Sequence, residues 1–211
     1  MWTHQDDTRV RIRRWAAMTL VPWLGVACGP GLAPLPPPFE PAPSHVAAPD
    51  SVLPATVPNV ASELRGRRLM IPVDGIAADR LVDTYEAQRD GGARRHYAID
   101  IAAPRGTPVL AADDGNVLRM GFNSLGGLTI YQTDPSRRFV YYYAHLDRYA
   151  SNLRDGSALA RGDVIGYVGT TGNAPPNAPH LHFQVMLYRD KWWEGESVNP
   201  FGVFELAGKK R

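Results

Sequence analysis

From about Val60 onward, glycine, proline, asparagine and aspartate residues divide the chain into short apolar runs. Runs of this kind between turn-forming residues are typical of β-strands. We therefore expect a mainly β fold, built as a small antiparallel sheet of the barrel or sandwich kind. The expected strands cover residues 69–73, 98–102, 108–112, 116–120, 128–133, 139–144, 164–168 and 181–187.

Two local patterns add to this prediction. Asp114-Gly115 is a strong signal for a two-residue hairpin turn between paired strands. Residues 78–88 form the one plausible helix, with Leu81, Val82 and Tyr85 on one side.

The first 27 residues are typical of an export signal, and residues 1–27 are assigned to a signal peptide. Basic residues end at Arg14, an apolar stretch covers residues 15–27, and small residues close it. A short buried helix is the alternative, but Pro22 would interrupt it. Arg13-Arg14 also suggests a twin-arginine exporter, although the flanking residues fit that signal poorly.

The single cysteine, Cys28, follows directly on the apolar stretch. This arrangement resembles a lipoprotein signal, in which the cysteine is acylated, becomes the mature N-terminus and anchors the chain to a membrane. Ordinary cleavage is the alternative, because Gly25 stands where such signals usually have leucine. Gly29 lacks the retention charge of an aspartate, so we expect an outer-membrane lipoprotein facing the periplasm, and otherwise a periplasmic or secreted protein.

Residues 28–60 are expected to be a linker. Ten prolines lie within residues 30–58, a composition that forms no packed core. At about 3.1 Å per residue, such an extended spacer reaches up to roughly 90 Å. The folded domain is expected over residues 61–205.

Charge and cysteine content exclude several classes of protein. The chain has 23 basic and 21 acidic residues, and the segment before Cys28 holds four arginines and two aspartates. The remainder therefore carries 19 charges of each sign and offers no electrostatic reason to bind nucleic acid. One cysteine excludes an internal disulfide framework and a four-thiolate zinc site.

Four of the six histidines fall inside the expected β domain. In a strand over residues 181–187, His180, His182 and Gln184 point away from the apolar face. The two imidazoles are then roughly 6.6–6.8 Å apart at the backbone, close enough to reach one metal site. Two solvated or hydrogen-bonded histidines are the alternative interpretation of this pair.

His96 and Asp100 add a histidine and a carboxylate. On a straight strand their spacing spans roughly 13 Å, too far to hold one ion. A helix could bring them together, but residues 98–102 are expected to be a strand, so a shared metal would place His96 on a bend before that strand. His145 shares a predicted strand face with Phe139, Tyr141 and Tyr143. Each of these pieces alone is more often structural.

Taken together, the His180 and His182 pair, the His96 and Asp100 pair and His145 are typical of a catalytic metal site. Two histidines and one aspartate are three ligands of the kind that leave a zinc position open for water. Two further histidines beside the metal would serve as general base and acid. The spacing does not say which of His180 and His182 is a ligand.

The motifs of this chain resemble those of the lysostaphin-type zinc endopeptidases, also called LytM-type domains. The resemblance covers about residues 69–200, most of the expected domain. It rests on the run from His96 through Val109, on Ala112-Asp113-Asp114-Gly115, Tyr143-Ala144-His145-Leu146, residues 162–169, Pro179-His180-Leu181-His182-Phe183 and Asn199-Pro200.

The resemblance implies a groove active site on the sheet and one zinc ion per chain. It makes His96, Asp100 and His182 the zinc ligands, and His145 and His180 the catalytic histidines. It also implies a metalloendopeptidase that uses a zinc-bound water to hydrolyse peptide bonds in peptidoglycan, in the stem peptide or the cross-link.

Two alternative functions are also compatible with the sequence, and some positions differ from the family pattern. One alternative is a non-catalytic activator of peptidoglycan amidases, and another is a wall-binding lipoprotein with vestigial histidines. Gln184 stands where the family often has glutamate. Trp192-Trp193 is expected to pack at an edge or to form a wall of the groove.

Overall fold

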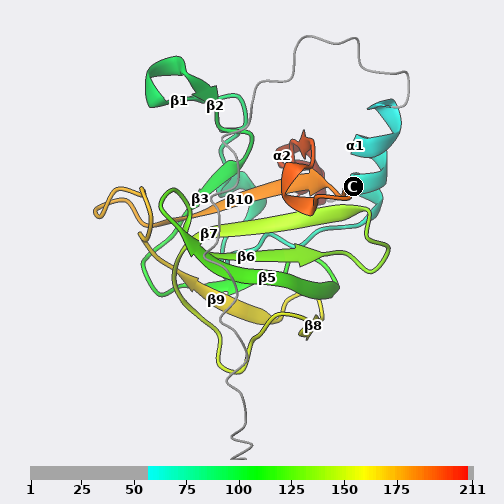
Figure 1. Cartoon of the computed structure of the whole chain (residues 1–211). Helices are drawn as coiled ribbons and strands as arrows, with labels where there is room; N and C mark the ends of the chain where they lie inside the picture. Colours follow the sequence, from blue (N-terminus) through cyan, green and yellow to red (C-terminus); the bar gives the residue numbers. More distant parts are fainter. Residues whose placement is uncertain (1–56, 209–211) are drawn as a thin grey trace, which may run out of the picture. The chain divides into compact units, whose positions relative to one another are not determined.

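The computed structural model describes residues 57–208 (Figure 1). Within these residues, one nine-stranded antiparallel sheet carries the fold. Its main path runs β11-β10-β7-β6-β5-β8, while β3 pairs with β10 and β9 joins β4 to β7. The expected mainly β, antiparallel fold is therefore confirmed. The strands of this sheet are β3 (Ile99–Ala102), β4 (Pro108–Leu110), β5 (Gly115–Asn123), β6 (Gly127–Thr133), β7 (Phe139–Tyr149), β8 (Ala158–Leu159), β9 (Val164–Val168), β10 (His180–Leu187) and β11 (Ser197–Val198).

Smaller elements lie outside this sheet (Figure 1). A separate hairpin pairs β1 with β2 just before His96. Among residues 57–208, no helix is long and apolar enough to cross a membrane. The remaining elements are α1 (Val57–Gly66), η1 (Ala78–Arg80), β1 (Gln88–Arg89), η2 (Asp90–Gly92), β2 (Arg94–Arg95), η3 (Trp192–Glu194) and α2 (Phe201–Gly208).

Seven of the eight expected strands correspond to observed strands, and the strand over residues 69–73 is wrong. Val73 forms an isolated bridge with Val109, and Met70 N–H and Pro72 O make single hydrogen bonds to Ala112 O and Leu110 N–H. Pro72 has no N–H to complete the pairing with a neighbouring strand. The segment still packs on the core through Leu69 and Val73.

The helix expected over residues 78–88 is also wrong. Only the single turn η1 forms, and Val82, assigned to its apolar side, is exposed. Tyr85 is buried, and its hydroxyl donates to Ser197 O at 2.8 Å. Beyond η1, the backbone carbonyls Tyr85 O and Ala87 O accept hydrogen bonds from the N–H groups of Tyr97 and His96 instead of from residues of a helix.

Asp114-Gly115 does not form the expected hairpin. β4 pairs with β9, whereas β5 pairs with β6 and β8, so the two strands flanking the dipeptide are not partners. A Cβ atom on Gly115 would lie 1.8 Å from Thr133 O. Glycine is required here because two backbones approach closely, a role that local sequence does not separate from a turn.

The main core packs on one face of the sheet. Along β10, Leu181, Phe183, Val185 and Leu187 are buried in it, as the alternation predicted. The two terminal helices cover this core through Leu64 of α1 and Phe204 of α2. Neither helix was predicted, although Pro58 in the first turn of α1 is a helix-start signal.

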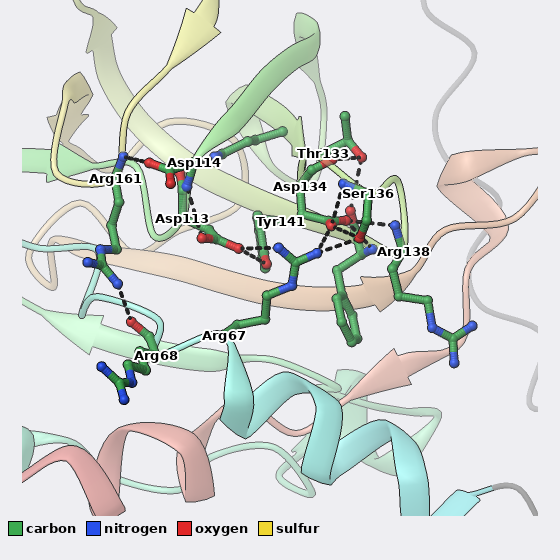
Figure 2. Close-up of polar contacts among 12 residues, drawn as sticks. Arg67, Arg68, Asp113, Asp114, Thr133, Asp134, Ser136, Arg138, Tyr141 and Arg161 are labelled. Carbon is green, nitrogen blue, oxygen red and sulfur yellow. Dashed lines mark hydrogen bonds and ion pairs between the residues drawn. The ribbon is translucent and has the colours of Figure 1, made fainter.

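A buried polar network, here called the Arg67 network, ties the end of α1 to the sheet (Figure 2). The Arg67 guanidinium pairs with Asp134 and lies 3.4 Å from Asp113 Oδ2. Tyr141 also donates to Asp113 Oδ2, at 2.8 Å. Asp134 accepts further bonds from backbone N–H groups of the β6–β7 turn, including that of Phe139 at 2.6 Å. Each buried carboxylate in this network has several donors.

Candidate metal centre and active site

The register between β3 and β10 brings two predicted ligands together. Asp100 lies directly opposite His182 in this antiparallel pair, so both side chains point to the same face of the sheet. On the other edge of β10, His182 lies opposite Ala144 of β7. A single row across three strands therefore carries Asp100, His182 and the residue before His145.

His96 lies on a bend before β3, as a shared site required. Tyr97 has φ 54° and turns the chain, which allows His96 and Asp100 to face each other over a short distance. His96 Nδ1 lies 2.9 Å from Thr84 O. A carbonyl only accepts hydrogen bonds, so Nδ1 carries the proton and Nε2 keeps its lone pair for the site.

His96, Asp100 and His182, here called the ligand cluster, bring one ligand atom each to a common point. All three atoms lie within 4.8 Å of one another. His96 Nε2 is 2.9 Å from His182 Nδ1 and 3.0 Å from Asp100 Oδ1, and His182 Nδ1 is 3.3 Å from the same oxygen. The structure thus brings together three residues that lie up to 86 positions apart in sequence.

The ligand cluster fits a zinc ion. Asp100 Oδ1 is buried and has no hydrogen-bond partner, which is costly for a carboxylate oxygen unless a cation faces it. Two imidazole nitrogens and one carboxylate oxygen are a usual protein ligand set for zinc. The Arg89 guanidinium donates to the other oxygen, Asp100 Oδ2, and this positive charge favours the ionised form of the carboxylate. The carboxylate is therefore ionised and ready to bind a metal.

His145 and His180, here called the histidine pair, lie beside the ligand cluster with ring centroids 4.9 Å apart. Each ring is held by a backbone carbonyl: His145 Nδ1 lies 2.8 Å from Thr171 O, and His180 Nδ1 lies 2.8 Å from Ala178 O. Nδ1 therefore carries a proton in each ring, and Nε2 is the nitrogen left to face the site. His180 Nε2 lies 3.8 Å from Asp100 Oδ1, which directs it to the same point.

His145 reaches the site by a route that the sequence did not predict. It was expected on the face of Tyr141 and Tyr143, which lie in the core, yet it lines the same cavity as Tyr142 and Ala144. The cause is local: His145 has φ 60°, and the pairing of β7 shifts register next to it. The left-handed residue reverses the alternation, so the prediction of its face was wrong.

The environment of His145 favours the uncharged form of its ring. Burial lowers its pKa to about 4, with a further contribution from His182. The ring is therefore neutral at neutral pH and can accept a proton. Burial also lowers the pKa of His182, which keeps that ring neutral and able to bind a metal.

All five residues lie on one cavity of about 340 Å³ on the face opposite the main core. Of the other residues that line this cavity, one was not predicted from the sequence and another had two alternative expected roles. Arg89 lines one side, and its Nη2 donates to Asp100 Oδ2 at 2.5 Å. Trp193 also lines the cavity, while Trp192 packs edge-on against Tyr131. The tryptophan pair thus combines both expected roles. No spacing rule connects Arg89 to Asp100, so no sequence signal could have found it.

Cys28 and the expected signal peptide lie outside the described residues. The linker expected over residues 28–60 lies outside them except at its end, because α1 already begins at Val57.

A mainly antiparallel sheet that carries two histidines and an aspartate beside a second histidine pair defines a candidate metallopeptidase site. The family model described as Peptidase family M23 matches residues 94–200, and the chain belongs to that family. The matched segment begins just before His96 and ends at Asn199-Pro200. The resemblance to the lysostaphin-type endopeptidases is therefore confirmed.

Several known proteins are similar to this chain. An L-Ala--D-Glu endopeptidase of Bacillus subtilis is 35% identical over 121 residues, which are 55% of this chain and 36% of that protein. The peptidoglycan DD-endopeptidase ShyC of Vibrio cholerae is 33% identical over 97 residues, 46% of this chain and 21% of that protein. The solved structure of the antimicrobial peptidase lysostaphin from Staphylococcus simulans has a TM-score of 0.51 and 29% identity, over 61% of this chain and 50% of that one. The match thus spans about a third or less of the two enzymes from Bacillus and Vibrio.

Proposed function

We propose that this chain is a zinc-dependent endopeptidase that hydrolyses peptide bonds in bacterial peptidoglycan. The observation that carries the proposal is the convergence of three ligand atoms, one of them a buried and unpartnered carboxylate oxygen, beside the histidine pair. Membership in a peptidase family and similarity to a peptidoglycan endopeptidase support the reaction and the polymer.

His96, Asp100 and His182 would hold the zinc ion. When bound, zinc acts as a Lewis acid that polarises a carbonyl oxygen and lowers the pKa of water to about 7. The three residues contribute one negative charge among them, and all three come from rigid positions next to or within strands. Such a set leaves room for a substrate at the open position.

The histidine pair would handle the protons. The lone pair of His145 Nε2 accepts a proton from the attacking water, since Nδ1 is already committed to Thr171 O. The protonated ring then returns this proton to the leaving amine. His180 is fixed in the same way by Ala178 O. In the protonated form of this ring, Nε2–H would donate to the substrate carbonyl oxygen as negative charge develops on it.

The substrate would be a peptide of the wall polymer that lies along the cavity. The similar proteins are named for different bonds, an L-Ala--D-Glu bond and a DD bond. The proposed substrate is therefore either a stem peptide or a cross-link. The masses of the released fragments would identify the bond that is cleaved.

We further propose the expected organisation of the chain: a signal peptide over residues 1–27, acylation of Cys28, a linker over residues 28–60 and the endopeptidase domain over residues 61–205. This places the enzyme in the cell envelope on a membrane tether, within reach of the wall. Metabolic labelling with a fatty acid tests the anchor. Labelled wild type and unlabelled Cys28→Ser are expected, and equal labelling of both would contradict it.

The test of the activity uses the chain from residue 28 with Cys28→Ser. Its zinc content is measured, and it is incubated with purified peptidoglycan with and without chelator, with mass spectrometry of the released fragments. One zinc per chain and chelator-sensitive cleavage are expected. Bound zinc without cleavage, together with stimulation of an amidase, would favour the activator function instead.

A further inference from the structure

The segment Asp83–Arg89, here called the positioning segment, contacts two of the three proposed ligands. Thr84 contributes through its backbone and its side chain. Thr84 O accepts the hydrogen bond from His96 Nδ1 at 2.9 Å, and Thr84 Oγ1 accepts one from the backbone N–H of Asp100 at 3.0 Å. One residue thus fixes the ring of His96 and the backbone position of Asp100.

Arg89 forms a hydrogen bond with only one of the two oxygens of the Asp100 carboxylate. Its Nη2 donates to Oδ2 at 2.5 Å, whereas Oδ1 faces the imidazoles of His96 and His182. A carboxylate held by one oxygen cannot rotate freely about its Cβ–Cγ bond. Arg89 therefore determines that Oδ1, the oxygen without a hydrogen-bond partner, is presented to the metal.

The positioning segment is itself held firmly. His96 N–H donates to Ala87 O at 2.9 Å, and the buried Tyr85 is anchored by its bond to Ser197 O. Arg89 lies opposite Arg94 in the β1–β2 hairpin. The turn of this hairpin contains Gly91 with φ 68° and Gly92 with φ 97°, conformations that other residues rarely adopt.

Arg89 supports the site and does not block it. Guanidinium has no lone pair available for a metal and stays protonated in proteins. Among residues 57–208, no histidine, cysteine, aspartate or glutamate of the positioning segment joins the ligand cluster. The segment in front of His96 is therefore an outer shell of the metal site rather than a source of a competing ligand.

We propose that Thr84 and Arg89 are positioning residues that raise the zinc affinity of the ligand cluster. The proposal rests on the proposed function, since it requires that His96 and Asp100 bind zinc. Outer-shell partners of metal ligands typically change metal affinity about 10–100-fold. Arg89 also brings a positive charge, which would repel a divalent cation. Replacing Arg89 should weaken zinc binding if positioning dominates, and strengthen it if charge repulsion dominates.

The experiment measures zinc affinity by competition with a chromogenic chelator, on the chain from residue 28 with Cys28→Ser. Arg89→Ala is expected to bind zinc about tenfold or more weakly, with Arg89→Lys between it and the wild type. Thr84→Val should weaken zinc binding in the same direction, and Thr84→Ser, which keeps the hydroxyl, should restore it.

Two matched controls lie outside the positioning segment. Arg119 pairs with Asp155 at an exposed site, and Thr107 donates to Pro104 O in an exposed turn. Arg119→Gln and Thr107→Val should bind zinc like the wild type. The melting temperature of each metal-free variant shows that it is folded.

Unchanged or tighter zinc binding by both Arg89→Ala and Thr84→Val would overturn the proposal. Failure of Thr84→Ser to restore affinity would overturn the role of Thr84. A different result would contradict the proposed function: a wild-type chain that binds no zinc, or that binds zinc without cleaving peptidoglycan.

Discussion

Two clusters of charged side chains lie in this domain, and they treat their carboxylates in opposite ways. In the Arg67 network, Asp134 is fully buried, pairs with Arg67 and accepts several backbone N–H groups (Figure 2). In the ligand cluster, Asp100 Oδ1 is buried without a hydrogen-bond partner and faces imidazole nitrogens.

The difference separates stability from function. A carboxylate with every lone pair used stabilises the fold and has nothing left for a cation. A buried carboxylate oxygen without a hydrogen-bond partner costs free energy until a cation binds there. Changes in the two clusters should therefore have separable effects, the first on unfolding and the second on metal binding and catalysis.

The largest expected effect is the loss of zinc and activity in His182→Ala. Two ligands cannot hold the ion, so zinc content should fall to background and cleavage to that of the chelated wild type. Urea unfolding of the metal-free chain should change little. Gln184→Ala, on the same face of β10, is the control and should keep its zinc; zinc-loaded His182→Ala would refute the ligand assignment.

His145→Ala should separate catalysis from metal binding. Loss of a general base typically costs about 10²–10⁴-fold in rate, while the ligand cluster is untouched. The turnover number should fall by this factor with one zinc per chain retained. Near-normal cleavage would remove His145 from the mechanism.

Arg67→Met should produce the reverse pattern. It leaves the buried Asp113 and Asp134 without their cation, and loss of one partner of a buried ion pair costs about 3–5 kcal/mol. Urea unfolding of the metal-free variant measures this loss in the free energy of unfolding. Zinc affinity below the unfolding transition should stay normal, and a stability loss below about 1 kcal/mol would contradict the role given to the Arg67 network.

Zinc removal should lower the stability of the wild type but not that of His182→Ala. A ligand present at 1,000 times its Kd stabilises the folded state by about 4.1 kcal/mol. Melting curves with zinc and with chelator measure the difference. An equal shift in both chains would indicate that zinc acts at another site.

The smallest effect is expected for Tyr141→Phe. It removes one of the hydrogen bonds to Asp113 Oδ2 and leaves that of Arg67, so it should cost about 0.5–1.5 kcal/mol in the free energy of unfolding. Cleavage at 25 °C should be unchanged. A loss of activity at constant stability would mean that the two clusters are coupled through β7.

The sequence predicted the sheet and most of its strands because alternating apolar residues and turn formers are local signals. It also indicated the placement of His96 on a bend, since the spacing to Asp100 is too long for a straight strand and residues 98–102 were predicted to be a strand rather than a helix. The helix over residues 78–88 failed because the backbone of that segment is recruited by His96 and Tyr97, which is a tertiary effect.

Other parts of the site could not be predicted for similar reasons. The face of His145 depends on one left-handed residue next to a register shift, and strand alternation carries no trace of it. The contact from Arg89 to Asp100 depends on a hairpin whose strands are only two residues long. Such short pairings have too little periodicity to be recognised in a sequence.

The position of the ligand cluster on β10 has a consequence for length variation in chains of this kind. Side chains change face at every residue of a strand, so one residue inserted between His180 and His182 would send the two imidazoles to opposite faces. Two inserted residues would restore the faces but separate the rings. Insertions in exposed turns, such as residues 151–157, leave these positions untouched. We therefore expect natural relatives to differ in length at their turns, and to keep this one interval fixed.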